Sequence, residues 1–201
     1  MAIAQLYLAS RSPRRAELLA QIGVTPDLSL LGAATREADE SARAGEDPQE
    51  YVRRLARMKA ALAWHRLVKR GLPILPVLAA DTTVALGREI LGKPADPADA
   101  RRMLALLSGG RHEVFTAVAL RTAHDLEVAC SRSAVSFRVL TAEEIDRYIA
   151  TGEPFDKAGA YGIQGRAAAF IAHLEGSYSG VMGLPLYETS GLLARAGISV
   201  I

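Results

Sequence analysis

The sequence predicts an α/β fold in a single domain. Strand-like runs alternate along the chain with segments that carry helix start signals, which is the pattern of α/β proteins. The length of 201 residues is typical of one domain, or of two lobes that share a core, so we expect one unit over 1–201. Hydrophobic residues make up 50% of the chain and aromatic residues 5%, which predicts an aliphatic core and argues against disorder.

The first part of the chain is predicted to form a strand, a helix and a loop. The apolar run at 3–9 indicates the strand. Ser12 is the expected N-cap of the helix, Pro13 occupies its first position, and Gly23 ends it. The acidic, alanine-rich segment 32–47 follows and is typical of a polar loop.

The middle of the chain carries the longest predicted helix and two strands. The helix begins at the capping-box-like sequence Asp47-Pro48-Gln49-Glu50 and runs to about residue 70. A buried strand is expected at 74–80, ending at Asp81. A second strand is expected over 82–91.

The second half continues the alternation of helices and strands. Asp96-Pro97 and the capping box at 141–144 indicate two helix starts. A glycine-rich loop over 153–166 precedes the C-terminal elements. The other expected elements are a helix from 96 to about 110, strands at 112–121, 126–140 and 167–174, and helices at 141–152 and 185–196.

A basic turn between the first strand and the first helix is the first candidate site. Arg14 and Arg15 occupy the first helical turn, where the helix dipole favours anions. A bound phosphate would compensate, because backbone N–H groups, two guanidinium groups and the hydroxyls of Ser10 and Ser12 converge there. The alternative is a solvated basic turn, since the spacing matches neither the Walker loop nor the dinucleotide fingerprint.

Asp81 is the second candidate. A carboxylate that ends a buried parallel strand lies where open α/β sheets bind ligands, and it would hold Mg²⁺ or orient a water molecule there. The alternative is a strand-end cap. Lys93, between Gly92 and Pro94, and Lys59, in the long helix, would bind phosphate as point charges or remain solvated on the surface.

Two glycine-rich segments complete the candidates. In segment 156–165, three glycines at intervals of three permit close backbone approach to a ligand. Gln164 lies among them and offers a donor and an acceptor that suit a flat base edge. Segment 176–186 mixes turn residues with an apolar run, which indicates a tight packing turn or a pocket wall.

Composition argues against several classes of function. The formal net charge of +2 lacks the basic excess of nucleic-acid-binding domains, and the longest apolar stretch, 72–80, is too short to span a membrane. Cys130 is the single cysteine, which excludes an internal disulfide, and the histidines show no metal-ligand spacing. Without a signal-peptide pattern, the protein is expected in the cytoplasm.

Five motifs, in this order, resemble those of the Maf family of nucleoside triphosphate pyrophosphatases. They are S-x-S-P-R-R at 10–15, A-D-T at 80–82, G-K-P at 92–94, D-K-A-G-A-Y-G-I-Q-G at 156–165 and G-S-Y-S-G-V-M-G-L-P-L at 176–186. The resemblance covers the chain from Leu6 to about Gly197. It implies an elongated mixed sheet with flanking helices and two lobes around a cleft, similar to the inosine triphosphate pyrophosphatases.

Within the Maf family, the chain is similar to the branch that hydrolyses dTTP and UTP to the monophosphate and pyrophosphate. This choice rests on Arg14, Thr82 and Gln164, because the 7-methyl-GTP branch typically has Trp, Gln and Glu at these specificity positions. The resemblance also implies a divalent metal cofactor, Mg²⁺ or Mn²⁺, modified pyrimidine nucleotides as further substrates, and a homodimer.

The candidate residues fit this chemistry, because cleavage of a phosphoanhydride needs charge neutralisation and an oriented water. Asp81 would accept a proton from water or bind the metal, and the sequence leaves both roles open. Lys93 would assist catalysis, and Gln164 would accept from the pyrimidine N3–H and donate to O4. The residues expected to hold the triphosphate are Ser10, Ser12, Arg14, Arg15, Lys59 and Lys93.

One position departs from the Maf pattern. The family carries an acidic residue after the second strand that contributes to the metal site, and counting without gaps places Ala34 or Thr35 there. A shift of two residues brings up Glu37, which is the expected second metal ligand beside Asp81. The departure keeps open a non-catalytic nucleotide-binding regulator of cell division. A 7-methyl-GTP pyrophosphatase is the other alternative, which the three specificity positions disfavour.

Overall fold

The sheet has seven strands in the part of the chain that the structure describes, residues 5–31 and 39–200 of a computed structural model. Its strand order is β2-β1-β3-β5-β6-β7, with β4 paired to β3. The pairings of β1 with β2 and β3 are parallel, and the others are antiparallel. The strands are β1 (Leu6–Leu8), β2 (Pro26–Asp27), β3 (Val77–Leu86), β4 (Glu89–Leu91), β5 (Arg111–Arg121), β6 (Leu126–Phe137) and β7 (Ile171–Glu175).

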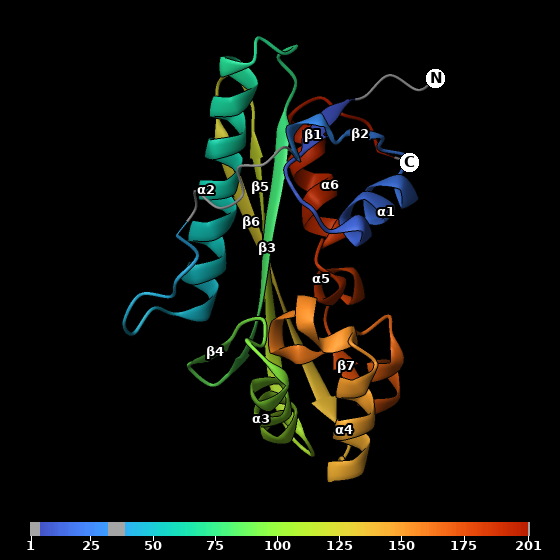
Figure 1. Ribbon diagram of the computed structural model, residues 1–201. Coiled ribbons are helices and arrows are strands. Elements are labelled where there is room, and N and C mark those ends of the chain that lie inside the picture. The colour runs from blue at the N-terminus through green and yellow to red at the C-terminus, as the bar shows by residue number, and fades with distance from the viewer. Residues whose placement is uncertain (1–4, 32–38, 201) are drawn as a thin grey trace.

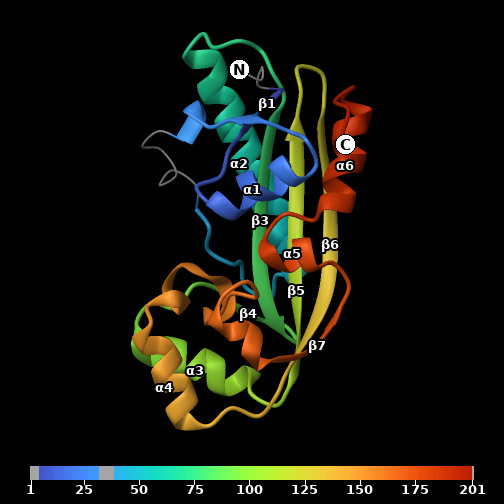
Figure 2. The ribbon, with the colours of Figure 1, turned by 90° about the vertical axis from the view of Figure 1, so that its right-hand side faces the viewer.

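Helices cover both faces of this sheet, so the predicted mixed α/β class is confirmed (Figure 1). Helix α2 lies along one face, and α1 and α6 lie against the other. In the view of Figure 2, β3, β5 and β6 run the length of an elongated molecule, and α3 and α4 form a second lobe at one end. The helices are α1 (Pro13–Gln21), α2 (Pro48–Lys69), α3 (Pro97–Leu107), α4 (Ala142–Ala150), α5 (Tyr178–Met182) and α6 (Leu186–Arg195).

The predicted starts of α1, α2 and α4 are confirmed, and those of α2 and α4 carry side-chain capping bonds. Pro13 begins α1 after Ser12, as expected. The side chain of Asp47 accepts hydrogen bonds from the backbone N–H groups of the first turn of α2. Thr141 and Glu144 form the reciprocal capping box of α4. The side chains of Asp47 and Thr141 satisfy backbone donors that have no partner inside the helix, which fixes where α2 and α4 begin.

Strand β3 continues through Asp81, so the prediction that a strand ends there is wrong. Thr82 and Thr83 stay in register with β5, opposite Thr116 and Phe115. The chain turns only after Leu86, where Gly87 adopts a positive φ of 60°, and returns as β4. Asp81 therefore lies in the middle of a strand that is antiparallel to β5.

The C-terminal third differs from the prediction in its short elements. A 3-10 helix at Arg166–Phe170 replaces the first part of the strand expected at 167–174, and β7 begins only at Ile171. Two further 3-10 turns lie within the predicted glycine-rich loop. Strand β6 ends at Phe137 rather than 140, and the short helix α5 was not predicted.

One edge of β3 is open beside Asp81. Strand β1 pairs with the beginning of β3, as far as Leu78, and β4 pairs with its end, from Val84 onward. Strand β5 occupies the other edge along Val77–Ala85. On the edge shared by β1 and β4, no described strand pairs with the five residues of 79–83. This interval is where the cleft between the two lobes lies.

Successive side chains of β3 face opposite sides of the sheet, as the pleat requires. Ala79 and Ala85 belong to the apolar cluster beneath α2. Leu78 and Ala80 belong to the cluster that packs against α1 and α6. The side chain of Asp81 is consequently on the α2 side, and that of Thr82 is on the opposite side.

Candidate active site

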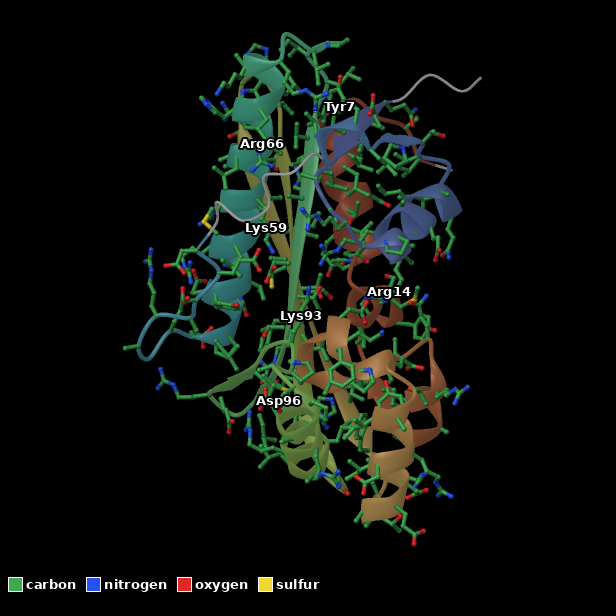
Figure 3. All side chains as sticks on the ribbon, in the orientation of Figure 1. Tyr7, Arg14, Lys59, Arg66, Lys93 and Asp96 are labelled. Atoms are coloured by element: carbon green, nitrogen blue, oxygen red, sulfur yellow. The ribbon has the colours of Figure 1, made fainter. Side chains whose placement is uncertain are left out.

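A cavity of about 930 Å³ occupies the open interval along β3, a volume within the usual range for ligand pockets. Its wall combines the turn before α1, the inner face of α2, the loop after β4 and the glycine-rich segment of the second lobe. Figure 3 shows Arg14, Lys59 and Lys93 reaching this region from three different elements. The cavity lining includes all the predicted site residues that the structure describes: Ser10, Ser12, Arg14, Arg15, Lys59, Asp81, Thr82, Lys93 and Gln164.

Lys59 and Asp81 form a close ion pair across the cavity floor. Lys59 Nζ lies 2.6 Å from Asp81 Oδ1, and Asp81 is only 7% exposed. Burial raises the pKa of Asp81, while the Lys59 ammonium and the Arg15 guanidinium oppose that shift. A buried carboxylate with an adjacent cation is suited to accept a proton from a water molecule.

Glu40 is a site residue that the sequence reasoning missed. Its Oε1 lies 3.0 Å from Lys59 Nζ, so the same ammonium contacts two carboxylates. The predicted ligand Glu37 lies outside the described residues. Glu40 lies three residues after Glu37 in the same acidic loop. The acidic character of this loop was the sequence signal that pointed to a carboxylate here.

Contacts to α2 hold the segment that carries Glu40. The hydroxyl of Tyr51 donates to the backbone oxygen of Glu40 at 2.9 Å. Arg54 donates to the backbone oxygen of Ser41 and, through two nitrogens, to the Glu46 carboxylate. The Arg54 guanidinium lowers the pKa of Glu46 to about 2, so this bidentate pair stays charged over the physiological range.

Arg15 is held by three hydrogen bonds and lines the cavity. Its Nε donates to the backbone oxygen of Gly183 at 2.7 Å, Nη1 donates to Ser10 Oγ at 2.9 Å, and Nη2 donates to Thr82 Oγ1 at 3.3 Å. Burial lowers the pKa of Arg15, and the Asp81 carboxylate opposes that change. Thr82, predicted as a specificity position, is thus bonded to an arginine.

Arg14 and Lys93 reach the cavity from opposite lobes. Arg14 Nη1 lies 3.8 Å from Asp156 Oδ2, a long ion pair that joins the first turn of α1 to the second lobe. Lys93 is exposed and follows β4, and its loop is fixed because Gly159 N–H donates to the backbone oxygen of Gly92 at 3.0 Å. Ser12 is the N-cap of α1 without a side-chain capping bond.

The glycines of segment 156–165 leave no room for side chains, and Gly162 and Gly165 also line the cavity, so their close approach to a ligand stays a prediction. A methyl group on Gly159 would lie 2.8 Å from a methyl of Val84, and one on Gly162 would lie 2.7 Å from Lys157 Cε. At Gly165 it would overlap the Glu153 carboxylate. Their lack of side chains lets the loop pack directly against Val84, Lys157 and Glu153.

Side chains of the second lobe also hold the glycine-rich loop 156–165, and these contacts place Gln164 at the cavity. The Glu153 carboxylate accepts from Tyr148 Oη at 2.8 Å and from the backbone N–H of Arg166 at 3.1 Å. Tyr161 Oη lies 2.8 Å from Nε2 of the buried His112, another contact that the sequence reasoning missed. Gln164, between Gly162 and Gly165, is exposed and lines the cavity.

Segment 176–186 is a tightly bonded turn that also forms part of the cavity wall through Val181, Met182 and Gly183, so both of its predicted interpretations are confirmed. Ser177 caps α5 by accepting from the backbone N–H of Gly180, and Ser179 Oγ accepts from the backbone N–H of Leu186. Ser133 in β6 bonds to the backbone of Ser177. Through Gly183, the same turn also contacts Arg15.

Comparison with known proteins assigns the family. The sequence model of the family described as "Maf-like protein" matches residues 5–196. The chain belongs to the Maf family. A protein named dTTP/UTP pyrophosphatase from Ralstonia nicotianae is 59% identical over 197 residues, covering 97% of this chain and 95% of that protein. Proteins with the same name from Cupriavidus metallidurans and Nitrosomonas europaea are 56% and 52% identical, each covering at least 96% of both chains.

The described part of the chain contains neither a preformed metal cluster nor a helix suited to a membrane. Over residues 5–31 and 39–200, no cluster of three or more His, Cys, Asp or Glu side chains has the arrangement of a metal centre. The paired carboxylates of Asp81 and Glu40 are the acidic groups that meet at Lys59. Among the same residues, no helix combines the length and the apolar character that a membrane crossing requires.

Proposed function

We propose that this Maf-family protein hydrolyses dTTP and UTP to the nucleoside monophosphate and pyrophosphate. The observation that carries the proposal is the buried Asp81–Lys59 pair in a cavity that also contains Arg14, Arg15 and Lys93. Phosphoanhydride cleavage needs charge neutralisation and an oriented water, and this set supplies both. The relatives named dTTP/UTP pyrophosphatase support the choice of substrate.

The triphosphate binds along the cationic wall of the cavity. Arg14 and Arg15 offer planar guanidinium groups that match phosphate oxygens, and Lys59 and Lys93 offer point charges. Ser10 accepts from Arg15, so its own hydroxyl hydrogen remains to donate to a phosphate oxygen. These groups neutralise the charge that develops as the anhydride bond breaks.

Asp81 accepts the proton of the attacking water. Its carboxylate is nearly buried and is kept beside Lys59, so it meets the water at a fixed position. Lys59 holds the carboxylate in place before substrate arrives and then contributes its positive charge to the reacting phosphates. This assignment makes Asp81 a catalytic residue and Lys59 part of the phosphate site.

The same carboxylates fit a divalent cation. Asp81 and Glu40 converge on the Lys59 ammonium, which marks a place where positive charge is favourable, and their oxygens are the hard donors that Mg²⁺ and Mn²⁺ prefer. We assign Asp81 and Glu40 as the residues that would hold the metal. When bound, the metal would supply charge neutralisation to the phosphate oxygens.

Gln164 reads the base. Its amide would accept from the N3–H of uracil or thymine and donate to O4, a pairing that suits cytosine less because cytosine N3 is an acceptor. The glycine-rich loop holds Gln164 between two glycines that pack on Lys157 and Glu153. The specificity set is Arg14, Thr82 and Gln164, with Thr82 acting through its bond to Arg15.

The quaternary structure and the location of the protein are inferred from its resemblance to the Maf family. We expect a homodimer that acts in the cytoplasm on free nucleotides. Light scattering coupled to gel filtration tests the dimer, and a monomer at micromolar concentration would contradict it. Fractionation of the native host followed by antibody detection tests the location.

A nucleotide panel tests the function. Purified protein is incubated with dTTP, UTP, CTP, GTP and 7-methyl-GTP in the presence of Mg²⁺ or Mn²⁺, and pyrophosphate is measured. We expect pyrophosphate to be released fastest from dTTP and UTP. Binding of these nucleotides without turnover would favour a non-catalytic regulator instead, and preferential cleavage of 7-methyl-GTP would assign the other branch.

A further inference from the structure

Thr116 lies behind the phosphate-binding end of the cavity, in the middle of β5. It is 1% exposed and is the sheet neighbour of Thr82. Its hydroxyl oxygen lies 3.0 Å from Thr82 Oγ1 and 2.8 Å from the backbone oxygen of Gly180 in α5. Thr116 is not among the described residues that line the cavity, so any effect on substrate must pass through another group.

The direction of these hydrogen bonds follows from the chemistry of the partners. The backbone oxygen of Gly180 can only accept, so Thr116 must use its single hydroxyl hydrogen there. Thr116 then accepts from Thr82, whose hydrogen is used in turn. The oxygen of Thr82 is left to accept from Arg15 Nη2. The result is a one-way chain from Arg15 through Thr82 and Thr116 to Gly180.

This chain of hydrogen bonds fixes how the Arg15 guanidinium is oriented. Nε donates to Gly183 and Nη1 donates to Ser10, so the chain through Thr82 is the third anchor. A guanidinium has five N–H groups, and these three bonds leave one hydrogen on each terminal nitrogen. Two N–H groups on adjacent nitrogens form the fork that binds phosphate oxygens in pairs.

We propose that Thr116 is a positioning residue that orients Arg15 for the phosphates of the substrate through Thr82. The inference deepens the proposed function and rests on it for the identity of the substrate. Loss of the Thr116 hydroxyl would leave Thr82 without an acceptor and free its hydroxyl to rotate. Thr82 Oγ1 would still accept from Arg15, but its side chain would no longer be held by Thr116, so the two remaining N–H groups of Arg15 would meet phosphate in a less defined geometry.

Four variants separate this role from a purely structural one. Thr116→Val keeps the shape and removes the hydroxyl, and Thr116→Ser restores it. Thr189→Val is the matched control, since Thr189 is equally buried and its hydroxyl has no hydrogen-bond partner among the described residues. Arg15→Lys keeps a positive charge, so binding stays measurable, but removes the fork.

The primary measurement is calorimetric binding of inorganic triphosphate, followed by KM and kcat with dTTP. Thr116→Val should weaken triphosphate binding about tenfold and raise KM by a similar factor with a smaller change in kcat. Thr116→Ser and Thr189→Val should stay within about twofold of the parent protein. The double variant Arg15→Lys/Thr116→Val should bind triphosphate within about twofold of Arg15→Lys alone, because Thr116 acts through the guanidinium fork that Arg15→Lys already lacks.

Unchanged triphosphate binding in Thr116→Val would overturn the inference, and so would an equally large loss when the substitution is added to Arg15→Lys. If thermal unfolding shows that Thr116→Val does not fold, Thr82→Val breaks the same chain at its other link, and the same comparisons apply. The parent protein could fail to cleave dTTP and UTP while Thr116→Val still binds triphosphate more weakly than the parent does. That combination would refute the proposed function and retain this inference. A parent that binds no triphosphate would refute the positioning role itself.

Discussion

The ammonium of Lys59 lies 2.6 Å from a carboxylate oxygen of Asp81. The two residues come from different elements, α2 and β3, and meet where one edge of β3 is left open between β1 and β4. The ion pair lets a carboxylate that is almost buried remain part of the cavity wall. The proposed chemistry depends on this pair.

Removal of the Asp81 charge tests its role directly. Asp81→Asn keeps the size of the side chain and a hydrogen-bonding oxygen for Lys59, so the fold should survive. Turnover of dTTP should fall on the order of 100-fold or more, because the proton acceptor is lost. Steady-state pyrophosphate release and thermal unfolding check the prediction together, and a folded variant with parental turnover would remove Asp81 from catalysis.

Glu40 should affect metal dependence more than substrate binding. In Glu40→Gln, one of the two carboxylates at Lys59 loses its charge, so the Mg²⁺ concentration for half-maximal activity should rise about tenfold or more. Glu143→Gln, an exposed site on α4, is the matched control. Identical metal titrations of Glu40→Gln and the parent protein would exclude Glu40 from the metal site.

Gln164 should control the choice of base. Gln164→Glu removes the donor for O4 and adds a negative charge, so the ratio of kcat/KM for dTTP to that for GTP should fall about tenfold. The two specificity constants, measured in parallel, check this. An unchanged ratio would mean that the base is recognised elsewhere in the cavity.

Gly165 should tolerate no side chain. The methyl group in Gly165→Ala would overlap the Glu153 carboxylate, so the loop or Glu153 must move at a cost of about 1–3 kcal/mol in unfolding free energy. Activity should fall as well, because Gln164 is the adjacent residue. Gly191→Ala in α6 is the control, since its nearest contact there is at 3.6 Å. Equal stability of the two variants, measured by urea unfolding, would show that the loop is not packed this tightly.

His112 should make stability depend on mildly acidic pH. Burial lowers the pKa of His112 from 6.5 to about 4. Between these two pH values the imidazole is therefore protonated in the unfolded chain and neutral in the folded protein. The unfolding free energy should therefore fall by about 3 kcal/mol as the pH drops from 6.5 to 4. Urea unfolding at a series of pH values measures this loss.

His112→Phe should have a flatter profile over the same pH range, at the cost of the hydrogen bond to Tyr161. His124→Gln, on an exposed turn, is the control and should keep the full dependence. An equally steep profile in His112→Phe would assign the acid sensitivity to other groups.

The sequence predicted the elements whose ends carry strong local signals. The helix starts at Pro13, Pro48, Pro97 and Ala142 follow from proline or capping residues that act within one turn. The strand containing Asp81 was predicted too short because a carboxylate is unusual in a buried strand. Its continuation depends on pairing with β5, which lies about 35 residues further along the chain.

The candidate site was predictable where residues act by their chemical type and less so where they act by position. Asp81 was found as a charge after an apolar run and Lys93 as a charge in a turn, whereas Lys59, inside the long helix, was assigned to the phosphates with the resemblance to the Maf family. Glu40 could not be separated from its acidic neighbours, because only contacts with α2 hold it at Lys59. Thr116 is an ordinary strand threonine in the sequence, and only the folded sheet brings it to Thr82.

Phosphorus NMR of the reaction with dTTP identifies the bond that breaks, so it shows whether the protein is a pyrophosphatase. In the presence of Mg²⁺, the three triphosphate signals should be replaced by those of dTMP and pyrophosphate in equal amounts, without dTDP or inorganic phosphate as early products. Formation of dTDP and phosphate, or three unchanged triphosphate signals, would contradict the proposed cleavage between the α- and β-phosphates.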